Sequence, residues 1–165
     1  VPYIPKVRAT IVATEAAEAN ALRAILEYFG YRVDIILVGS RAEFMKVLSG
    51  EIPTEEIIIF AVHGVKDGIY IQGEDSVTAE EIKNAKLFGT LILNLGCDTG
   101  REEYQKAFTD AGVKHYVAPN GYPEGNSALM FAARFFYELK NEVSVEDAAS
   151  KAASLDQETA MFQIT

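Results

Sequence analysis

Short apolar runs alternate with amphipathic runs along the whole chain, and this alternation limits the fold more than any other feature. The apolar runs that we predict as strands cover residues 7–13, 33–38, 57–62, 91–95 and 114–118. Strands that are apolar on both faces are typical of parallel sheets, which need helices on each side to cover them. The pattern therefore predicts an α/β protein whose mostly parallel sheet is covered by helices.

Capping residues mark where the intervening helices are expected to begin. Thr14 is expected to cap a helix over residues 15–29, which ends at Gly30, a residue suited to a left-handed stop. Serine or threonine stands three residues before an acidic residue at four further starts, which are Ser40, Thr78, Thr99 and Ser144. In this spacing the acid can return a hydrogen bond to the amide of the capping residue. We therefore expect a helix after each of these four residues.

Two further segments complete the predicted elements. Asp67-Gly68 is a turn sequence, so a small hairpin or edge strand is expected after His63. A helix over residues 127–139 is also expected, because apolar residues recur there at helical spacing. The side chains expected on its buried stripe are Leu129, Met130, Ala133, Phe136 and Tyr137.

Length and charge restrict the class of protein and its partners. A chain of 165 residues is long enough for one ordinary domain, so we interpret residues 1–165 as a single domain. The net charge of −9 disfavours nucleic acid and anionic lipid surfaces. The longest apolar run, over residues 57–62, is far shorter than the roughly 20 residues of a membrane-spanning helix. We therefore expect neither a nucleic acid nor a membrane as a partner.

The cysteine content and the first residues bear on the compartment. Cys97 is the only cysteine, so the chain cannot form an internal disulfide, and we expect a reducing, cytoplasmic environment. The chain starts at Val1, and the short apolar segment that follows does not predict a signal peptide. We expect the chain to be a segment excised from a longer protein.

Two chemically useful side chains follow two of the predicted strands. His63 follows the run over residues 57–62, and Cys97 follows the run over residues 91–95. Sites in parallel sheets form beyond the carboxyl ends of the strands, because the loops diverge there. If these strands are neighbours, about 4.8 Å apart, the imidazole and the thiol share one crevice. A thiolate can attack a carbonyl carbon and an imidazole can protonate a leaving amine, so the pair predicts acyl transfer.

The residues around the pair modify this prediction. Glycine lets the main chain approach a substrate, so the amides of Gly64 and Cys97 are expected to face a developing oxyanion. The start of a helix after Thr99 would stabilise a thiolate. Three acidic residues act in the opposite sense and raise the pKa of the thiol, and they are Asp98, Glu102 and Glu103.

Simpler interpretations of these residues stay open. A single cysteine in an apolar strand is most often a small core residue, and a histidine at a strand end is as often structural. The joint placement of His63 and Cys97 favours a site. His115 has no such neighbours and is interpreted as an ordinary strand residue. The loop over residues 121–125, which contains Tyr122, follows the next strand and is expected near the crevice.

Longer motifs extend beyond the two residues. They are FAVHG at 60–64, VTAEEI at 77–82 and LILNLGCDTG at 91–100. In this order they resemble the successive motifs of CHAT domains, the caspase-like cysteine peptidases related to separase. The likeness continues through residues 104–112, 128–137, 145–149 and 160–164, the last of which resembles the final strand of the family.

This resemblance implies a caspase-like three-layer sandwich, with a mostly parallel six-stranded sheet and helices on both faces. It makes His63 and Cys97 the catalytic dyad. The residue two before the cysteine, Leu95, would then line the pocket for the substrate residue that precedes the cut. Glu15 is either a negative charge for a basic substrate residue or an ordinary first-turn acid. The chain departs from the family at residues 119–125, where CHAT domains usually carry an acidic segment with tryptophan.

The leading hypothesis is a cysteine endopeptidase that cleaves peptide bonds through the Cys97-His63 dyad and an acyl-enzyme. Its expected partner is a protein or peptide substrate, with no cofactor and no metal. The alternative is a pseudo-peptidase in which the same fold is a binding or scaffolding module. Either form can have a regulatory partner or a fused domain. A class I amidotransferase elbow is disfavoured, because it needs glycine where Leu95 and Thr99 stand.

Overall fold

A six-stranded sheet in the order β2-β1-β3-β6-β7-β8 forms the centre of the molecule. The computed structural model describes residues 7–87, 89 and 91–165. In sheet order the strands are Arg32–Leu37, Arg8–Ala13, Ile57–Ala61, Leu91–Asn94, His115–Pro119 and Phe162–Ile164. The first five are parallel, and β8 is antiparallel to β7. The predicted sheet is therefore confirmed, with ends that differ by at most one residue in the first five strands and by two at the start of β8.

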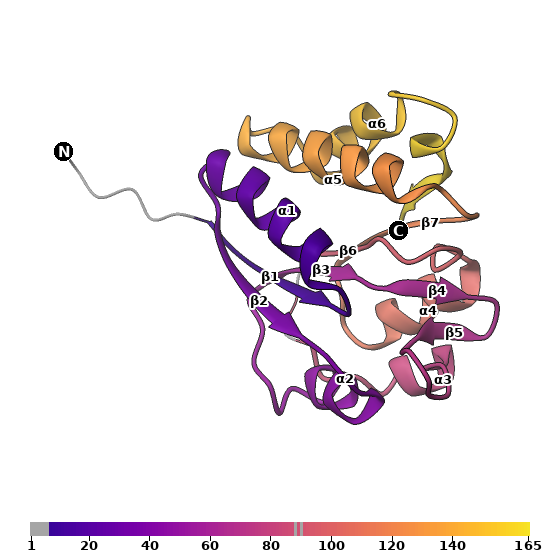
Figure 1. The fold of residues 1–165 in the computed structure, drawn as a ribbon. Coiled ribbons are helices and arrows are strands. Elements are labelled where there is room, and N and C mark those ends of the chain that lie inside the picture. The colour runs from indigo at the N-terminus through magenta and orange to yellow at the C-terminus, as the bar shows by residue number, and fades with distance from the viewer. Residues whose placement is uncertain (1–6, 88, 90) are drawn as a thin grey trace.

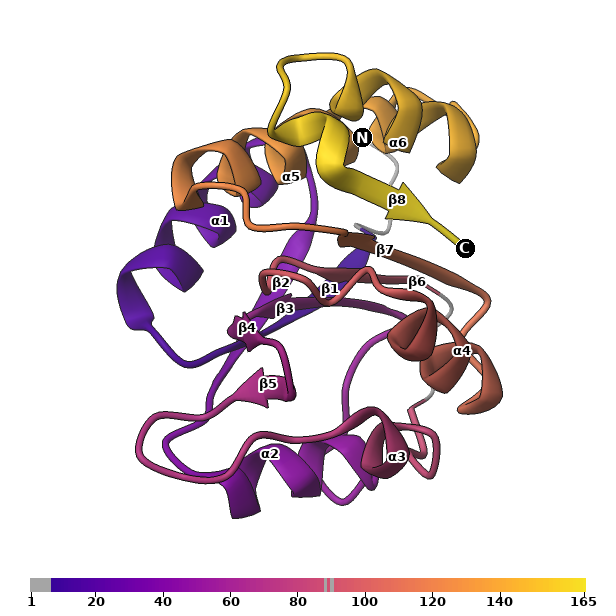
Figure 2. The same cartoon turned by 90° about the vertical axis from the view of Figure 1, so that its right-hand side faces the viewer.

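Helices cover both faces of the sheet (Figures 1 and 2). On one face lie α1 (Ala16–Tyr28), α5 (Gly125–Lys140) and α6 (Val145–Ala153). On the other lie α2 (Arg41–Leu48), α3 (Ala79–Ile82) and α4 (Glu102–Asp110). This confirms the three-layer sandwich. None of the helices in the described part of the chain has the length and apolar character needed to span a membrane.

Each face of the sheet packs into its own apolar core. Successive side chains of a strand point to opposite faces. In β3, Ile59 therefore packs with α1 and α5, while Ile58 and Phe60 pack with α2 and α4. Because every strand of the centre is apolar on both faces, it can be buried on both, which is why continuous apolar runs predicted this sheet.

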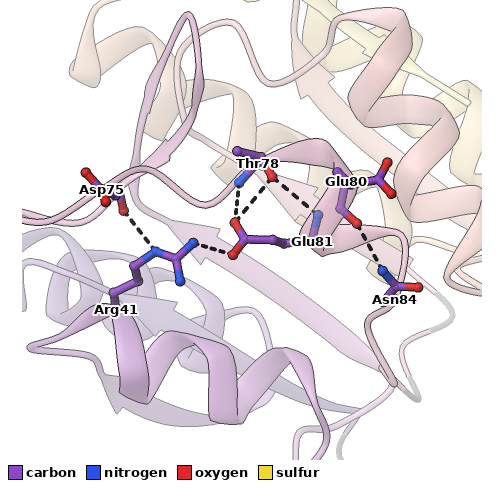
Figure 3. A network of polar contacts seen from close by, with 6 residues as sticks. All are labelled: Arg41, Asp75, Thr78, Glu80, Glu81 and Asn84. Atoms are coloured by element: carbon purple, nitrogen blue, oxygen red, sulfur yellow. Dashed lines mark hydrogen bonds and ion pairs between the residues drawn. The ribbon is translucent and has the colours of Figure 1, made fainter.

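A two-stranded hairpin continues from the end of β3 (Figure 1). It consists of β4 (His63–Val65) and β5 (Gly68–Tyr70), so the predicted hairpin is confirmed, with the turn at Lys66-Asp67 and Gly68 as the first residue of β5. The chain after the hairpin is tied to α2 by Arg41 (Figure 3). The Arg41 guanidinium donates to the Glu81 carboxylate, and its Nε lies 3.1 Å from the Asp75 carbonyl oxygen. These contacts hold the segment that follows the hairpin against the start of α2.

Three of the predicted caps form and two do not. The hydroxyls of Ser40, Thr78 and Ser144 accept from backbone amides in the first turns, and Thr78 forms a reciprocal box with Glu81 (Figure 3). The Thr14 prediction is wrong, because α1 is preceded by Glu15 and Thr14 Oγ1 is buried away from any cap. The Thr99 prediction is also wrong, because its hydroxyl donates to the Gly96 carbonyl oxygen at 2.6 Å and α4 begins only at Glu102.

The long helix α5 forms, but its buried stripe differs from the predicted one. Met130 and Tyr137 are 55% and 49% exposed. The buried apolar side chains of the helix are Ala128, Phe131, Ala132, Phe135 and Phe136. Phe131 stacks on Phe162 of β8, with ring centroids 4.0 Å apart. The helix is therefore rotated relative to the prediction, so that its phenylalanines fill the core and reach the last strand.

Candidate active site

His63 and Cys97 lie at the carboxyl edge of neighbouring strands. Strands β3 and β6 pair in parallel, with Phe60 opposite Asn94. His63 follows β3 and opens the hairpin, and Cys97 lies in the loop after β6. The structure therefore brings both residues to one edge of the sheet, as their sequence positions predict.

Gly64 is in direct contact with the backbone of Cys97. A Cβ atom at Gly64 would lie only 1.8 Å from the Cys97 carbonyl oxygen, and 2.9 Å from its nitrogen. Gly96 closes the contact from the other side, since a Cβ there would lie 3.2 Å from the Gly64 nitrogen. Only glycine leaves room for two main chains at this distance. The close approach of Gly64 to Cys97 places the residue before it, His63, next to the cysteine loop.

A buried hydrogen-bond network holds the loop that carries Cys97. The Asn94 side chain accepts from the Gly96 amide at 2.9 Å, and donates to the Tyr116 hydroxyl at 3.2 Å. The Tyr116 hydroxyl in turn donates to the Thr99 carbonyl oxygen at 2.7 Å. Asn94, Thr99 and Tyr116 are all at most 2% exposed. Sequence reasoning missed this network, although Asn94 is the one polar residue in the apolar run over 91–95.

The turn after Cys97 is fastened to the loop that follows β7. Asp98 has a positive φ of 57°, a conformation uncommon for residues other than glycine. Its amide donates to the Gly121 carbonyl oxygen at 2.7 Å, and Cys97 Sγ lies 3.8 Å from the Pro123 carbonyl oxygen. Tyr122, between these two acceptors, is 61% exposed. The loop over 121–125 therefore borders the cysteine, as predicted from its place after the neighbouring strand.

Arg101 connects the cysteine loop to the hairpin. Its Nε lies 3.2 Å from the Asp98 carbonyl oxygen and 3.1 Å from the Asp98 carboxylate. The same guanidinium donates to the carbonyl oxygen of Lys66, between β4 and β5. One side chain thus bonds both segments that carry the candidate dyad. Nothing in the sequence pattern pointed to this residue.

Glu15 contacts the imidazole of His63. The Glu15 Oε1 atom lies 3.0 Å from His63 Nε2, and both side chains are exposed to solvent. One turn further along α1, partial burial raises the pKa of Glu18, while the charge of His63 lowers it. Leu95 is placed differently from Glu15. It is 5% exposed and packs in the core with α1 and α5.

The backbone amide of Gly64 is not used by the hairpin. Ile69, opposite Gly64, exchanges both of its backbone hydrogen bonds with Val77, at 2.9 Å each. In an antiparallel pair the N–H and C=O of one residue point to the same side. Gly64 and Ile69 therefore form a non-hydrogen-bonded pair, and the Gly64 amide points away from β5. This leaves it free of the ladder at the place where it meets Cys97.

Burial raises the pKa of the Cys97 thiol above its ordinary value, its own backbone amide lowers it, and the Asp98 charge raises it. The helix that we expected to stabilise the thiolate begins at Glu102, too far from Cys97 for its N-terminus to lower the pKa of the thiol. Because the thiolate is the reactive form, alkylation by iodoacetamide is expected to keep rising with pH beyond the point at which a free cysteine levels off. Asp98→Asn is expected to move the profile to lower pH, but only in part, because burial is the larger cause. A profile identical to that of free cysteine would contradict the assignment.

No protein-family model and no curated protein matches the chain. Solved structures do match. The Saccharomyces cerevisiae separase in its complex with securin superposes with a TM-score of 0.63 at 13% identity, covering 98% of this chain and 12% of the separase chain. The Arg-specific cysteine proteinase gingipain R superposes with a TM-score of 0.62 at 10% identity, covering 93% of this chain and 44% of its own. The fold is caspase-like. The caspase-like fold here spans less than half the length of either protein.

Proposed function

We propose that the chain is a cysteine peptidase that cleaves peptide bonds with Cys97 as nucleophile and His63 as general base and acid. The observation that carries the proposal is the contact of Gly64 with the Cys97 backbone, which joins the two strand ends. The caspase-like fold, shared with two kinds of cysteine peptidase, supports it.

The proposed reaction has two steps, acylation of Cys97 and hydrolysis of the acyl-enzyme. His63 takes the proton of the Cys97 thiol, and the thiolate attacks the carbonyl carbon of the scissile bond. The oxyanion is stabilised by the amides of Gly64 and Cys97. When the intermediate collapses, the C–N bond breaks and the imidazolium gives its proton to the leaving amine. Water, deprotonated by His63, then attacks the thioester, which releases the carboxylic acid product and returns the thiol.

In this scheme Glu15 orients the His63 ring and stabilises its protonated form. Its carboxylate, 3.0 Å from His63 Nε2, stabilises the imidazolium that forms when the thiol loses its proton. This help matters because burial and Asp98 raise the pKa of Cys97, so that the thiol is the resting form. Since Glu15 is engaged by His63, its position supports an orienting role for this carboxylate.

The substrate is proposed to be a protein or a peptide, in a reducing compartment such as the cytoplasm. The sheet, its two cores and the candidate dyad all lie within this chain, so we propose that residues 1–165 act as one peptidase domain. The separase structure was determined with securin bound. By analogy, a regulatory partner or a fused domain is proposed for this chain as well.

One observation favours the alternative, a binding or scaffolding module. The Cys97 thiol is directed to the Pro123 carbonyl oxygen and the His63 ring is bonded to Glu15. In a module without activity this arrangement would be permanent. In a peptidase the His63 ring meets the thiol once substrate binds, because catalytic hydrogen bonds often tighten only in the complex.

Mass spectrometry after incubation with a panel of peptidyl acyloxymethyl ketones tests the proposal. The peptidase is expected to form one covalent adduct at Cys97, with a rate that depends on the peptide residue next to the ketone. Cys97→Ala is expected to form none, and His63→Ala is expected to react at least about 100-fold more slowly. Absence of adduct across the panel, or equal rates with and without His63, would favour the binding module.

A further inference from the structure

A hollow of about 330 Å³ lies beside His63, on the side away from Cys97. It is bounded by the residues that follow β1 and β2 and by the end of the hairpin. The strand order β2-β1-β3-β6-β7 puts the carboxyl ends of β1 and β2 on one side of His63, and Cys97 with the Pro123 loop on the other. His63 therefore stands between the nucleophile and the hollow.

This order fixes which part of a substrate the hollow would meet, given the proposed peptidase function. The acyl part of the substrate becomes bonded to Cys97. The amine part receives its proton from His63 and must lie on the side of the imidazole. We propose that the hollow binds the side chain of the residue that follows the cut, and that it prefers a lysine or an arginine there.

The walls of the hollow favour a long cationic side chain. Its apolar part is formed by Val38 and Ile71, which are 4% and 2% exposed and can pack against a methylene stem. Its polar part is formed by the Glu15 carboxylate, the Tyr70 ring with its hydroxyl, and the Gln72 amide. None of the described lining residues is a lysine or an arginine. The hollow thus offers acceptors and negative charge to a cation.

Neighbouring charges reinforce this preference. Glu43 Oε2 lies 2.8 Å from the Gly39 amide, at the rim formed by the end of β2. The nearby cation Arg41 is turned away, because its guanidinium is bonded to Glu81 and to the Asp75 carbonyl oxygen. An acidic side chain in the hollow would therefore meet the Glu15 and Glu43 carboxylates, with the His63 imidazole as the one group among the described lining residues that can carry a positive charge.

The test uses four internally quenched peptides that are identical except for lysine, arginine, leucine or glutamate after the cut. The acyl part is taken from the best ketone of the panel. The ratio of kcat/KM for lysine over glutamate is expected to exceed about tenfold. Gln72→Lys adds a cation at an exposed position of the hollow and is expected to lower that ratio at least about fivefold. Gln157→Lys adds the same charge on the exposed loop after α6 and is expected to leave the ratio unchanged.

The outcomes separate this proposal from the one on which it rests. Ketone labelling of Cys97 reports on the peptidase alone, because the probe has no residue after the cut. Labelling together with equal cleavage of the four peptides overturns the hollow as a subsite and leaves the peptidase standing. An equal ratio in Gln72→Lys and wild type also overturns it. Absence of labelling overturns the peptidase, and the subsite with it.

Discussion

Gly64→Ala is expected to reduce the reaction of Cys97 with peptidyl ketones by at least about 100-fold, because misplacement of reacting groups by about 1 Å can have that effect. The new methyl group would lie 1.8 Å from the Cys97 carbonyl oxygen and 2.8 Å from its carbon. These are backbone atoms, so no side chain can rotate to make room. Either the hairpin that begins at His63 or the loop that carries Cys97 must move, and either movement separates the dyad.

The same overpacking lowers stability, by about 3 kcal/mol at the upper end of the usual range. Denaturant unfolding measures this loss, and labelling is compared at conditions where both proteins are folded. Gly125→Ala is the matched control, because nothing lies within 4 Å of a Cβ at that position. It is expected to fold and react like the wild type. Unchanged labelling in Gly64→Ala would show that the contact between the two strand ends does not organise the site.

The sheet could be predicted because burial on both faces leaves a direct trace in the sequence. Residues 57–61 and 91–94 are almost entirely apolar, which neither a solvent-exposed strand nor an amphipathic helix tolerates. The hairpin could also be predicted, because Asp67-Gly68 is a turn sequence, although the turn itself is formed by Lys66 and Asp67.

The orientation of α5 could not be predicted in the same way. Almost every residue from 128 to 137 is apolar, so several stripes fit a helical period equally well. The choice is made by tertiary packing, in which Phe131 stacks on Phe162 and Tyr31 meets Phe136 edge to face. Phe162 lies more than thirty positions from Phe131 in the sequence. Tyr31 lies more than one hundred positions from Phe136, and its hydroxyl also donates to the Phe136 carbonyl oxygen.

In the candidate site, too, some features could be predicted from the sequence and others could not. His63 and Cys97 could be found from sequence because each stands next to a strand end and a glycine. The Thr99 hydroxyl failed as a cap because the Gly96 carbonyl oxygen, three residues back, binds it instead. This competition between a cap and a local backbone acceptor depends on the conformation of the loop, which Tyr116 fixes from another strand.

Arg101→Ala is expected to slow labelling of Cys97 by about 10- to 100-fold, because the two segments that carry the dyad lose their common tie. The guanidinium bonds the Asp98 carbonyl oxygen and carboxylate on one side and the Lys66 carbonyl oxygen on the other. Without it, Asp98, with its φ of 57°, keeps its backbone bond to Gly121 but loses the contacts with Arg101. The loss of charged hydrogen bonds also lowers stability by about 2 kcal/mol.

Arg101→Lys separates positioning from stability, because an ammonium group keeps the charge but cannot bond both segments with one planar fork. Labelling is therefore expected to recover only in part, while the free energy of unfolding recovers further. Arg23→Ala is the control, since Arg23 pairs with Glu27 on the exposed surface of α1 and is expected to change neither quantity by much. If Arg101→Ala lowers stability but the folded fraction still reacts at the wild-type rate, Arg101 supports the fold and does not position the dyad. If instead the labelling rate falls while the melting temperature stays unchanged, the effect of Arg101 is on the alignment of His63 with Cys97.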